Sequence, residues 1–384
     1  MDFQLSEEQL MIQKAAREFA QQQCLPGVIE RDEHQKVPFD QLNHLADLGF
    51  LGMMTDPQYG GAGMDTISYV LAMEEVSKVD SSVSVAMSVN NSLVCWGLEH
   101  FGNKAQKNKY LTPLAHGKKD GSLYIGAFLL SEPEAGSDAT HQHTSAVKEG
   151  EFYIINGVKN WITNGSTASV YLVIAQTDYT KGHKGINAFI VDKNTPGITV
   201  GAKENKMGIR GSDTHAISFT DVKVPAENRI GEEGFGFNFA MKTLNGGRIG
   251  IAAQALGIAS GAYELALAYS KERKTFGKPI HEHQAIQFKL AEMATKIETA
   301  RLLCFKAAWE KDQHLDYTTS AAMAKLYASD TAMWVTTEAV QIHGGYGFVK
   351  EFHVERLMRD AKITQIYEGT SEIQKMVIGR SITK

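Results

Sequence analysis

The sequence has few cysteines and no repeated or low-complexity segment. Only Cys24, Cys95 and Cys304 occur among its 384 residues, an odd number of thiols at distant positions. This pattern argues against a disulfide framework and against a thiolate metal site. Free thiols fit a reducing compartment, so we expect a cytoplasmic protein.

Long apolar runs and an excess of positive charge are also missing. The sequence has no run of about 18 apolar residues, and its N-terminal stretch 1–19 is acidic and amphipathic rather than basic and then apolar. We therefore predict neither export nor membrane insertion. Lys and Arg number 39 against 44 Asp and Glu, with the two signs interleaved and a net charge of -5. This balance argues against a polyanion such as DNA as the main partner.

The residues that are present favour a large globular protein. Hydrophobic residues make up 43% of the chain, enough to bury a core in two or three structural units. The pattern is helical, then β, then helical, an α+β multi-domain organisation. It predicts an N-terminal helical domain over residues 1–122, a middle β domain over 123–233 and a C-terminal helical domain over 234–384.

Local signals support this order of elements. Ser6 and Gln9 predict a capping box at the start of a helix, and we expect Leu10, Ala16 and Phe19 to share one face of that helix. Near the C-terminus, two long stretches rich in Ala, Leu and Met have helical spacing, residues 237–274 and 286–311.

The middle of the chain has the signals of an all-β domain. Residues 153–155 are β-formers and are followed by Asn156-Gly157, a dipeptide that predicts a hairpin turn. Further short β-rich runs follow at 170–175, 188–191 and 216–219.

Two polar segments in this domain are suited to holding a ligand. The first, Leu130-Ser-Glu-Pro-Glu-Ala-Gly-Ser-Asp138, is a turn that offers hydroxyls and free backbone N–H groups to a ligand rich in acceptors. Alone it is more often a plain polar turn. The second, Asn160-Trp-Ile-Thr-Asn-Gly165, ends a predicted strand with an indole and a hydroxyl beside a tight turn.

Two further segments lie near the C-terminus. Gln341-Ile-His-Gly-Gly-Tyr-Gly-Phe348, continuing through Glu351, Arg356 and Asp360, has glycines that let a backbone approach a flat or phosphorylated ligand. Gln365-Ile-Tyr-Glu-Gly-Thr-Ser-Glu372 places a carboxylate directly before a glycine and two hydroxyls. The alternative reading of Glu368 is a solvated carboxylate at a helix end.

By these four segments the chain resembles the acyl-CoA dehydrogenase family, and the resemblance extends from Phe3 to Gly379. The local sequence is most similar to the short-chain, butyryl-CoA branch of that family. The resemblance implies a middle β-barrel or sandwich and a C-terminal four-helix bundle. It implies FAD as the cofactor, an acyl-CoA substrate, electron-transfer flavoprotein as the electron acceptor, and a homo-oligomer, most simply a homotetramer.

The resemblance also implies the flavin contacts. Ser131 would lie near the reactive edge of the isoalloxazine, Trp161 would pack on one face, and residues 341–345 would reach the flavin of a neighbouring subunit. The full set of implied cofactor residues is Phe128, Leu129, Leu130, Ser131, Glu132, Pro133, Glu134, Ala135, Gly136, Ser137, Trp161, Ile162, Thr163, Arg273, Lys274, Thr275, His283, Gln284, Gln341, Ile342, His343, Gly344, Gly345, Thr370, Ser371 and Glu372.

Glu368 matches the family's base, which takes the α-proton while the β-hydrogen leaves as hydride to the flavin. This task needs a partly desolvated carboxylate and stabilisation of the enolate, which the family obtains from the base residue's backbone N–H and a ribityl hydroxyl. Residues implied at the substrate are Ser137, Asn245, Gly246, Gly247, Arg248, Tyr367 and Gly369. Many relatives have Asp at the position of Asn245, and Arg248 is equally compatible with an ion pair.

Three absences narrow the substrate and the chemistry. Relatives of the isovaleryl and long-chain types carry their base where this chain has Gly247, and glutaryl types carry an arginine in the stretch matching 82–86, which has no cation here. A dicarboxylyl substrate is therefore disfavoured, because its second charge would be buried unpaired. The pairs His141/His143 and His281/His283 lack a third ligand, so we predict no metal. An oxidase of related fold and a DNA-associated flavoprotein relative are the alternative functions.

Overall fold

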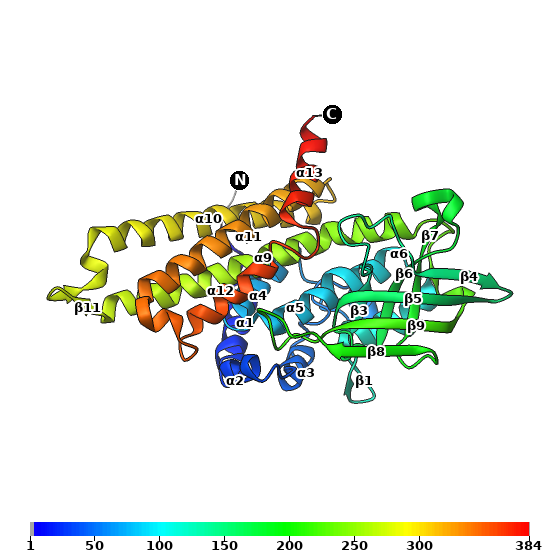
Figure 1. Ribbon diagram of the computed structural model, residues 1–384, viewed down its shortest axis with the longest axis horizontal. Helices are drawn as coiled ribbons and strands as arrows, with labels where there is room; N and C mark the ends of the chain where they lie inside the picture. The colour runs from blue at the N-terminus through cyan, green and yellow to red at the C-terminus, as the bar shows by residue number, and fades with distance from the viewer. Residues whose placement is uncertain (1–3, 384) are drawn as a thin grey trace.

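The computed structural model describes residues 4–383 as two helical regions with a β domain at one end (Figure 1). Residues 1–3 and 384, which include Phe3 where the resemblance begins, lie outside the described residues. Long helices of the C-terminal region run along the molecule, and the N-terminal helices pack against them (Figure 1). The β strands lie together at the opposite end from β11 (Lys274–Thr275).

The N-terminal region consists of short helices that begin at polar caps. Ser6 and Gln9 form the predicted capping box of the first helix, and Asp65 and Asp80 cap α4 and α5 by accepting backbone N–H groups. The α-helices are α1 (Glu7–Phe19), α2 (Val28–Glu33), α3 (Phe39–Asp47), α4 (Thr66–Ser77), α5 (Ser81–Ser88), α6 (Trp96–Phe101), α7 (Lys104–Gln106) and α8 (Thr112–His116).

The face of α1 that is buried differs from the predicted one. Ala16 and Phe19 are buried as expected, but Leu10 is 50% exposed. Six positions separate Leu10 from Ala16, which is about 240° of rotation at 3.6 residues per turn, so the two side chains cannot share a narrow face. The expectation for Leu10 was wrong.

The middle region is an eight-stranded sheet bent into two halves. Strands β10, β7, β6 and β3 form one half and β4, β5, β9 and β8 the other, and a single pair between Ser145 and Gln176 joins them. Side chains of both halves, such as Tyr171 and Phe219, share one core, as in a sandwich. The strands are β3 (Gly126–Leu129), β4 (Ser145–Glu149), β5 (Phe152–Thr163), β6 (Val170–Gln176), β7 (Ile186–Asp192), β8 (Ile198–Lys203), β9 (Thr214–Pro225) and β10 (Arg229–Ile230).

Asn156-Gly157 does not form the predicted hairpin turn. The turn lies earlier, between Glu149 and Phe152, and β5 continues through Asn156 and Gly157 with a register shift against β9. Gly157 has a φ of 143°, and a Cβ there would come within 2.6 Å of Thr144. The glycine therefore serves a bulge and a close strand contact, which the dipeptide signal does not distinguish from a turn.

The C-terminal region is a helical bundle that matches the predicted long helices. Its helices are α9 (Gly236–Glu272), α10 (Gln284–Asp312), α11 (Thr318–His343), α12 (His353–Ile363) and α13 (Ser371–Ile382). Helix α9 is long and apolar enough to cross a membrane, although its sequence contains no unbroken run of about 18 apolar residues. However, 72% of its most apolar window is buried inside the protein, as expected of a core helix.

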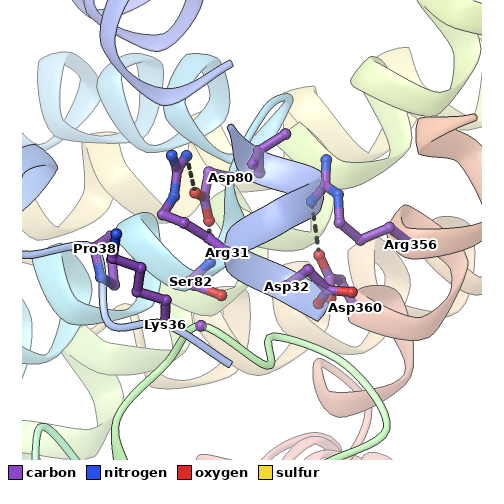
Figure 2. A pocket seen from close by; sticks show the side chains of 10 residues that line it. Arg31, Asp32, Lys36, Pro38, Asp80, Ser82, Arg356 and Asp360 are labelled. Carbon is purple, nitrogen blue, oxygen red and sulfur yellow. Dashed lines mark hydrogen bonds and ion pairs between the residues drawn. The ribbon is translucent and has the colours of Figure 1, made fainter. Parts of the chain in front are cut away.

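A buried charged junction ties the three regions together (Figure 2). Arg31 of α2 pairs with Asp80 at 2.9 Å within the N-terminal region. Arg356 of α12 pairs with Asp360 at 3.1 Å and also donates to the carbonyl of the N-terminal residue Val79 at 2.7 Å. Asp360 also accepts the backbone N–H of Ile209 from the β domain. Burial raises the pKa of Asp360 to about 6 although Arg356 opposes that rise. The junction therefore fixes α12, which leads directly into the segment that carries Glu368.

We predict that Arg356→Met destabilises the protein in a pH-dependent manner. The Asp360 carboxyl has a folded-state pKa above its unfolded value, so stability is lost as pH rises between the two, and removal of Arg356 widens that interval. Breaking a buried pair costs about 3–5 kcal/mol. Urea unfolding should show this loss at about pH 8 and a smaller one at about pH 5. Arg380→Met, at an exposed arginine, is the control. Equal losses at both pH values would contradict the argument.

Candidate active site

Glu368 lies in the short loop between α12 and α13. Its backbone φ is 51° and that of Gly369 is 93°, so the chain makes a left-handed turn at the carboxylate. The residue is partly exposed, but its Oε2 atom is buried and has no hydrogen-bond partner within residues 4–383. The alternative of a solvated carboxylate is thus not what the structure shows. A buried acceptor without a partner is costly and indicates a functional position.

The Glu368 carboxylate rests against the backbone of α9 at Gly247. A Cβ at Gly247 would overlap Oε2 of Glu368 and come within 2.8 Å of Leu93. Gly247 is the position from which some relatives were expected to supply their base. The structure therefore brings the two alternative base positions, Gly247 and Glu368, to the same place.

Burial and two cations set the charge state of Glu368. Desolvation raises the pKa of its carboxyl to about 7, and Lys325 of α11 and Arg248 of α9 oppose this rise. Burial likewise lowers the pKa of Lys325 to about 8, and the negative charge of Glu368 opposes that lowering. A carboxylate with a pKa near neutrality is suited to accept a proton and release it again.

The implied substrate residues on α9 form a hydrogen-bonded chain. Arg248 donates to Asn245 Oδ1 at 2.8 Å, and Asn245 Nδ2 donates to Thr318 Oγ1 at 3.1 Å. Arg248 is buried and forms no ion pair within the described part of the chain, and its Nε has no partner there. Burial lowers the pKa of Arg248, although Glu368 opposes this. The Tyr367 hydroxyl donates to Gln254 Oε1.

The first implied flavin segment begins in the last two residues of β3 and continues beyond the strand. Leu129 and Ala135 are core residues, so their side chains face away from solvent and only their backbones are available to a ligand. The carboxylate of Glu132 also turns inward, where it accepts from the fully buried Lys159 at 2.7 Å. Ser131 is bonded to the second polar segment of this domain, because its carbonyl oxygen accepts the backbone N–H of Asn160 at 2.8 Å.

Lys159 connects the two implied flavin segments of the β domain. Its ammonium donates to Leu130 O at 3.0 Å, Glu132 Oε1 at 2.7 Å and Gln142 Oε1 at 2.5 Å. Burial lowers the pKa of Lys159 to about 8. Two residues further on, Trp161 is 61% exposed with a φ of 61°, so its indole stands free on the surface. Sequence reasoning missed Lys159, since an isolated lysine in a strand normally indicates a solvated position.

The second implied flavin set lines a cavity in the helical bundle. This cavity has a volume of about 560 Å³ and is lined by six of the predicted residues and by Tyr269. The Tyr269 ring stacks on that of His343, with 4.3 Å between the ring centroids. His283 lies beside it, 3.1 Å from Thr275 Oγ1. The predicted residues that line the cavity are Arg273, Thr275, Ile342, His343, Gly344 and Gly345.

The two implied flavin sets lie in different parts of one chain. Figure 1 places β11, with Lys274 and Thr275, at the end of the bundle that is farthest from the β domain, and the first set belongs to the β domain. One chain therefore does not gather all the predicted cofactor residues into one site. The third set begins α13, where Thr370 Oγ1 caps the helix and the buried Ser371 Oγ has no partner among the described residues.

The two histidine pairs do not form a larger group. The rings of His141 and His143 lie 5.0 Å apart at a steep angle, and His281 and His283 bond to Ser270 and Thr275. Nowhere in residues 4–383 do three His, Cys, Asp or Glu side chains lie together in a way that could hold a metal.

Comparison with known proteins gives matches over the whole chain. Sequence models for the N-terminal, middle and C-terminal domains of acyl-CoA dehydrogenase match residues 6–118, 127–222 and 234–383. A short-chain specific acyl-CoA dehydrogenase of Clostridium acetobutylicum is 50% identical over 382 residues, which cover 100% of both chains.

Two solved structures are similar over 100% of both chains. The butyryl-CoA dehydrogenase of Megasphaera elsdenii has a TM-score of 0.97 and 50% identity. A chain from work on the electron transferring flavoprotein of Acidaminococcus fermentans has a TM-score of 0.97 and 49% identity.

We predict opposite effects from alanine at two adjacent glycines of α9. Gly246→Ala should raise the free energy of unfolding by up to about 1 kcal/mol, because alanine favours a helix and its Cβ would meet only Ser92 O at 3.6 Å and Tyr317 at 4.0 Å. Gly247→Ala should instead lower it by about 1–3 kcal/mol through overlap with Glu368. Urea unfolding of both variants measures the difference. Equal stabilisation by both would show that Glu368 does not rest on Gly247.

Proposed function

The chain belongs to the acyl-CoA dehydrogenase family, and from that premise we propose that Glu368 removes the α-proton of a short-chain acyl-CoA thioester. The enzyme is a flavin-dependent oxidoreductase. One observation carries the proposal: a carboxylate oxygen is buried against Gly247 without a hydrogen-bond partner among the described residues.

The site suits the abstraction of a weakly acidic proton. Desolvation makes the carboxylate more basic, while Lys325 and Arg248 keep enough of it ionised near neutral pH. The α-proton passes to a Glu368 oxygen, a C=C bond forms, and the β-hydrogen leaves with its electron pair. Bound FAD supplies the acceptor for that hydride. The loop geometry contributes by orienting the carboxylate before the substrate arrives.

The chain's own residues fit FAD as the flavin. An exposed indole at Trp161, a cavity with Arg273 in its lining, and an unpartnered buried hydroxyl at Ser371 are groups that a flavin, an adenine and a pyrophosphate would use. Because β11, next to Arg273, lies at the end of the bundle away from the β domain that holds Trp161, we propose that each cofactor is bound between copies, in a homotetramer.

Similarity and composition narrow the substrate and the partner. Relatives 50% identical to this chain are named short-chain specific or butyryl-CoA dehydrogenases, and α5 residues 82–86 contain no cation for a second carboxylate. We therefore propose short, uncharged acyl chains and electron-transfer flavoprotein as the acceptor in the cytoplasm. These names also favour a dehydrogenase over an oxidase or a DNA-associated relative.

We predict that Glu368→Gln abolishes most flavin reduction without loss of binding. Gln keeps the volume of Glu but cannot accept the proton, and loss of a general base costs about 10²- to 10⁴-fold. Anaerobic stopped-flow mixing with butyryl-CoA measures the rate, with FAD content and substrate affinity checked separately. Glu151→Gln, at an exposed carboxylate in the turn before β5, is the control. Reduction within about threefold of wild type would exclude Glu368 as the base.

A second pair of variants tests whether a carboxylate supplied from position 247 of α9 can replace the carboxylate of Glu368. A side chain at Gly247 points into the volume of the Glu368 carboxylate. Gly247→Glu combined with Glu368→Gly should therefore recover part of the rate that Glu368→Gly alone loses, limited by imperfect orientation. No recovery, in a variant that still binds FAD, would mean that the two positions are not equivalent.

A further inference from the structure

Lys325 holds the loop that carries Glu368 from the side of α11. Its side chain is 0% exposed, and its ammonium donates to the carbonyl oxygen of Gly369 at 2.7 Å. Gln374 of α13 donates to the same carbonyl at 2.9 Å and to the carbonyl of Glu368 at 3.2 Å. Two helices therefore pin the peptide groups that follow the carboxylate.

The pinned segment has a backbone that needs support. Glu368 is not a glycine, yet it has a φ of 51°, and Gly369 follows with a φ of 93°. A left-handed conformation is unfavourable for a residue that carries a side chain. The bonds from Lys325 and Gln374 offset this cost, and the turn directs the Glu368 side chain onto Gly247.

The charge of Lys325 acts on the carboxylate without a hydrogen bond to it. Among cations that oppose the raised pKa of Glu368, Lys325 has the larger effect and Arg248 the smaller. Oε2 of Glu368 stays without a partner within the described chain, so Lys325 stabilises the negative charge but does not block the oxygen. An ion pair in direct contact would make the carboxylate a weaker base.

We propose that Lys325 is a positioning residue for the reaction: it fixes the Gly369 carbonyl so that Glu368 meets the substrate, and its charge keeps that carboxylate ionised. This role rests on the proposed function of Glu368. Helix α11 also holds the loop at a second point, because Asp330 of this helix accepts a hydrogen bond from the Gln365 side chain at 2.6 Å.

Among the charged and titratable groups around Lys325 and Glu368, Lys325 has the largest effect in lowering the pKa of Glu368. Arg248 stays as a second cation, so removing Lys325 should raise the pKa of Glu368 without making the site neutral. The groups that face the pair are Arg248 of α9, Tyr69 of α4, Tyr367 of the same loop, Asp330 of α11, Glu372 of α13 and, through Tyr367, Asp360 of α12.

The test is the pH dependence of flavin reduction in the FAD-loaded enzyme with butyryl-CoA, between about pH 6 and pH 9. In wild type the rate should rise with pH around the Glu368 pKa of about 7. Lys325→Met should move this midpoint upward by about one unit, the usual effect of losing an opposite charge. At neutral pH that shift alone reduces the ionised fraction about fivefold, and loss of the loop contact lowers the rate further.

Two variants separate the charge from the hydrogen bond. Lys325→Arg keeps the cation and should keep the midpoint near that of wild type, whereas Lys325→Gln keeps a donor without charge and should show the shifted midpoint. Lys362→Met removes an exposed lysine whose ammonium bonds Gln365 near the same loop, and it should shift nothing because water screens its charge.

The outcomes are distinct. A wild-type midpoint and a rate within about twofold of wild type in Lys325→Met would overturn the role of Lys325 while leaving Glu368 as the base. If Lys325→Met does not fold, equal midpoints in the Arg and Gln variants would overturn it instead. Failure of the proposed function itself would appear separately, as retained flavin reduction in Glu368→Gln.

Discussion

The site depends on the contact of the Glu368 carboxylate with the bare backbone of Gly247. This contact removes one carboxylate oxygen from water and leaves it without a partner among residues 4–383, which raises the pKa of the carboxyl to about 7. It requires a glycine on α9 and a left-handed turn at Glu368. It also requires cations close enough to keep the carboxylate ionised but not in contact with the free oxygen. The buried lysine and arginine supply these charges.

The fold serves this contact by fixing three pieces of chain that are distant in sequence. Helix α9 supplies Gly247, α11 supplies Lys325, and α12 is tied to the β domain through Asp360 and to the N-terminal region through Arg356. The β domain has a similar arrangement at its implied flavin segment, where buried Lys159 donates both to the carbonyl of Leu130 and to the carboxylate of Glu132. In both places a buried ammonium organises a loop whose neighbouring side chains remain available to a ligand.

Much of this could be predicted from the sequence, and the failures have physical causes. The capping box at Ser6 and the long helices are local signals and were correct, whereas Leu10 was placed on the wrong face by a spacing error. Asn156-Gly157 has the composition of a turn, but strand pairing with β9 overrides that preference. Lys325 and Lys159 escaped notice because their partners lie 44 and 27 residues away, and burial of a lysine is a tertiary property. Glu368 was assigned as the base by resemblance, and this role and the flavin contacts of the other residues stay predictions.

The state of the Glu368 carboxyl can be measured without substrate or turnover. Infrared difference spectra of the wild-type protein minus Glu368→Gln, recorded across a pH titration, isolate one carboxyl group among the 44 acidic residues. The account predicts a protonated C=O band that disappears with a midpoint near pH 7, in line with the raised pKa of Glu368. A band that titrates near about pH 4.3, the ordinary value for a glutamate, would contradict the desolvated carboxylate on which the site depends.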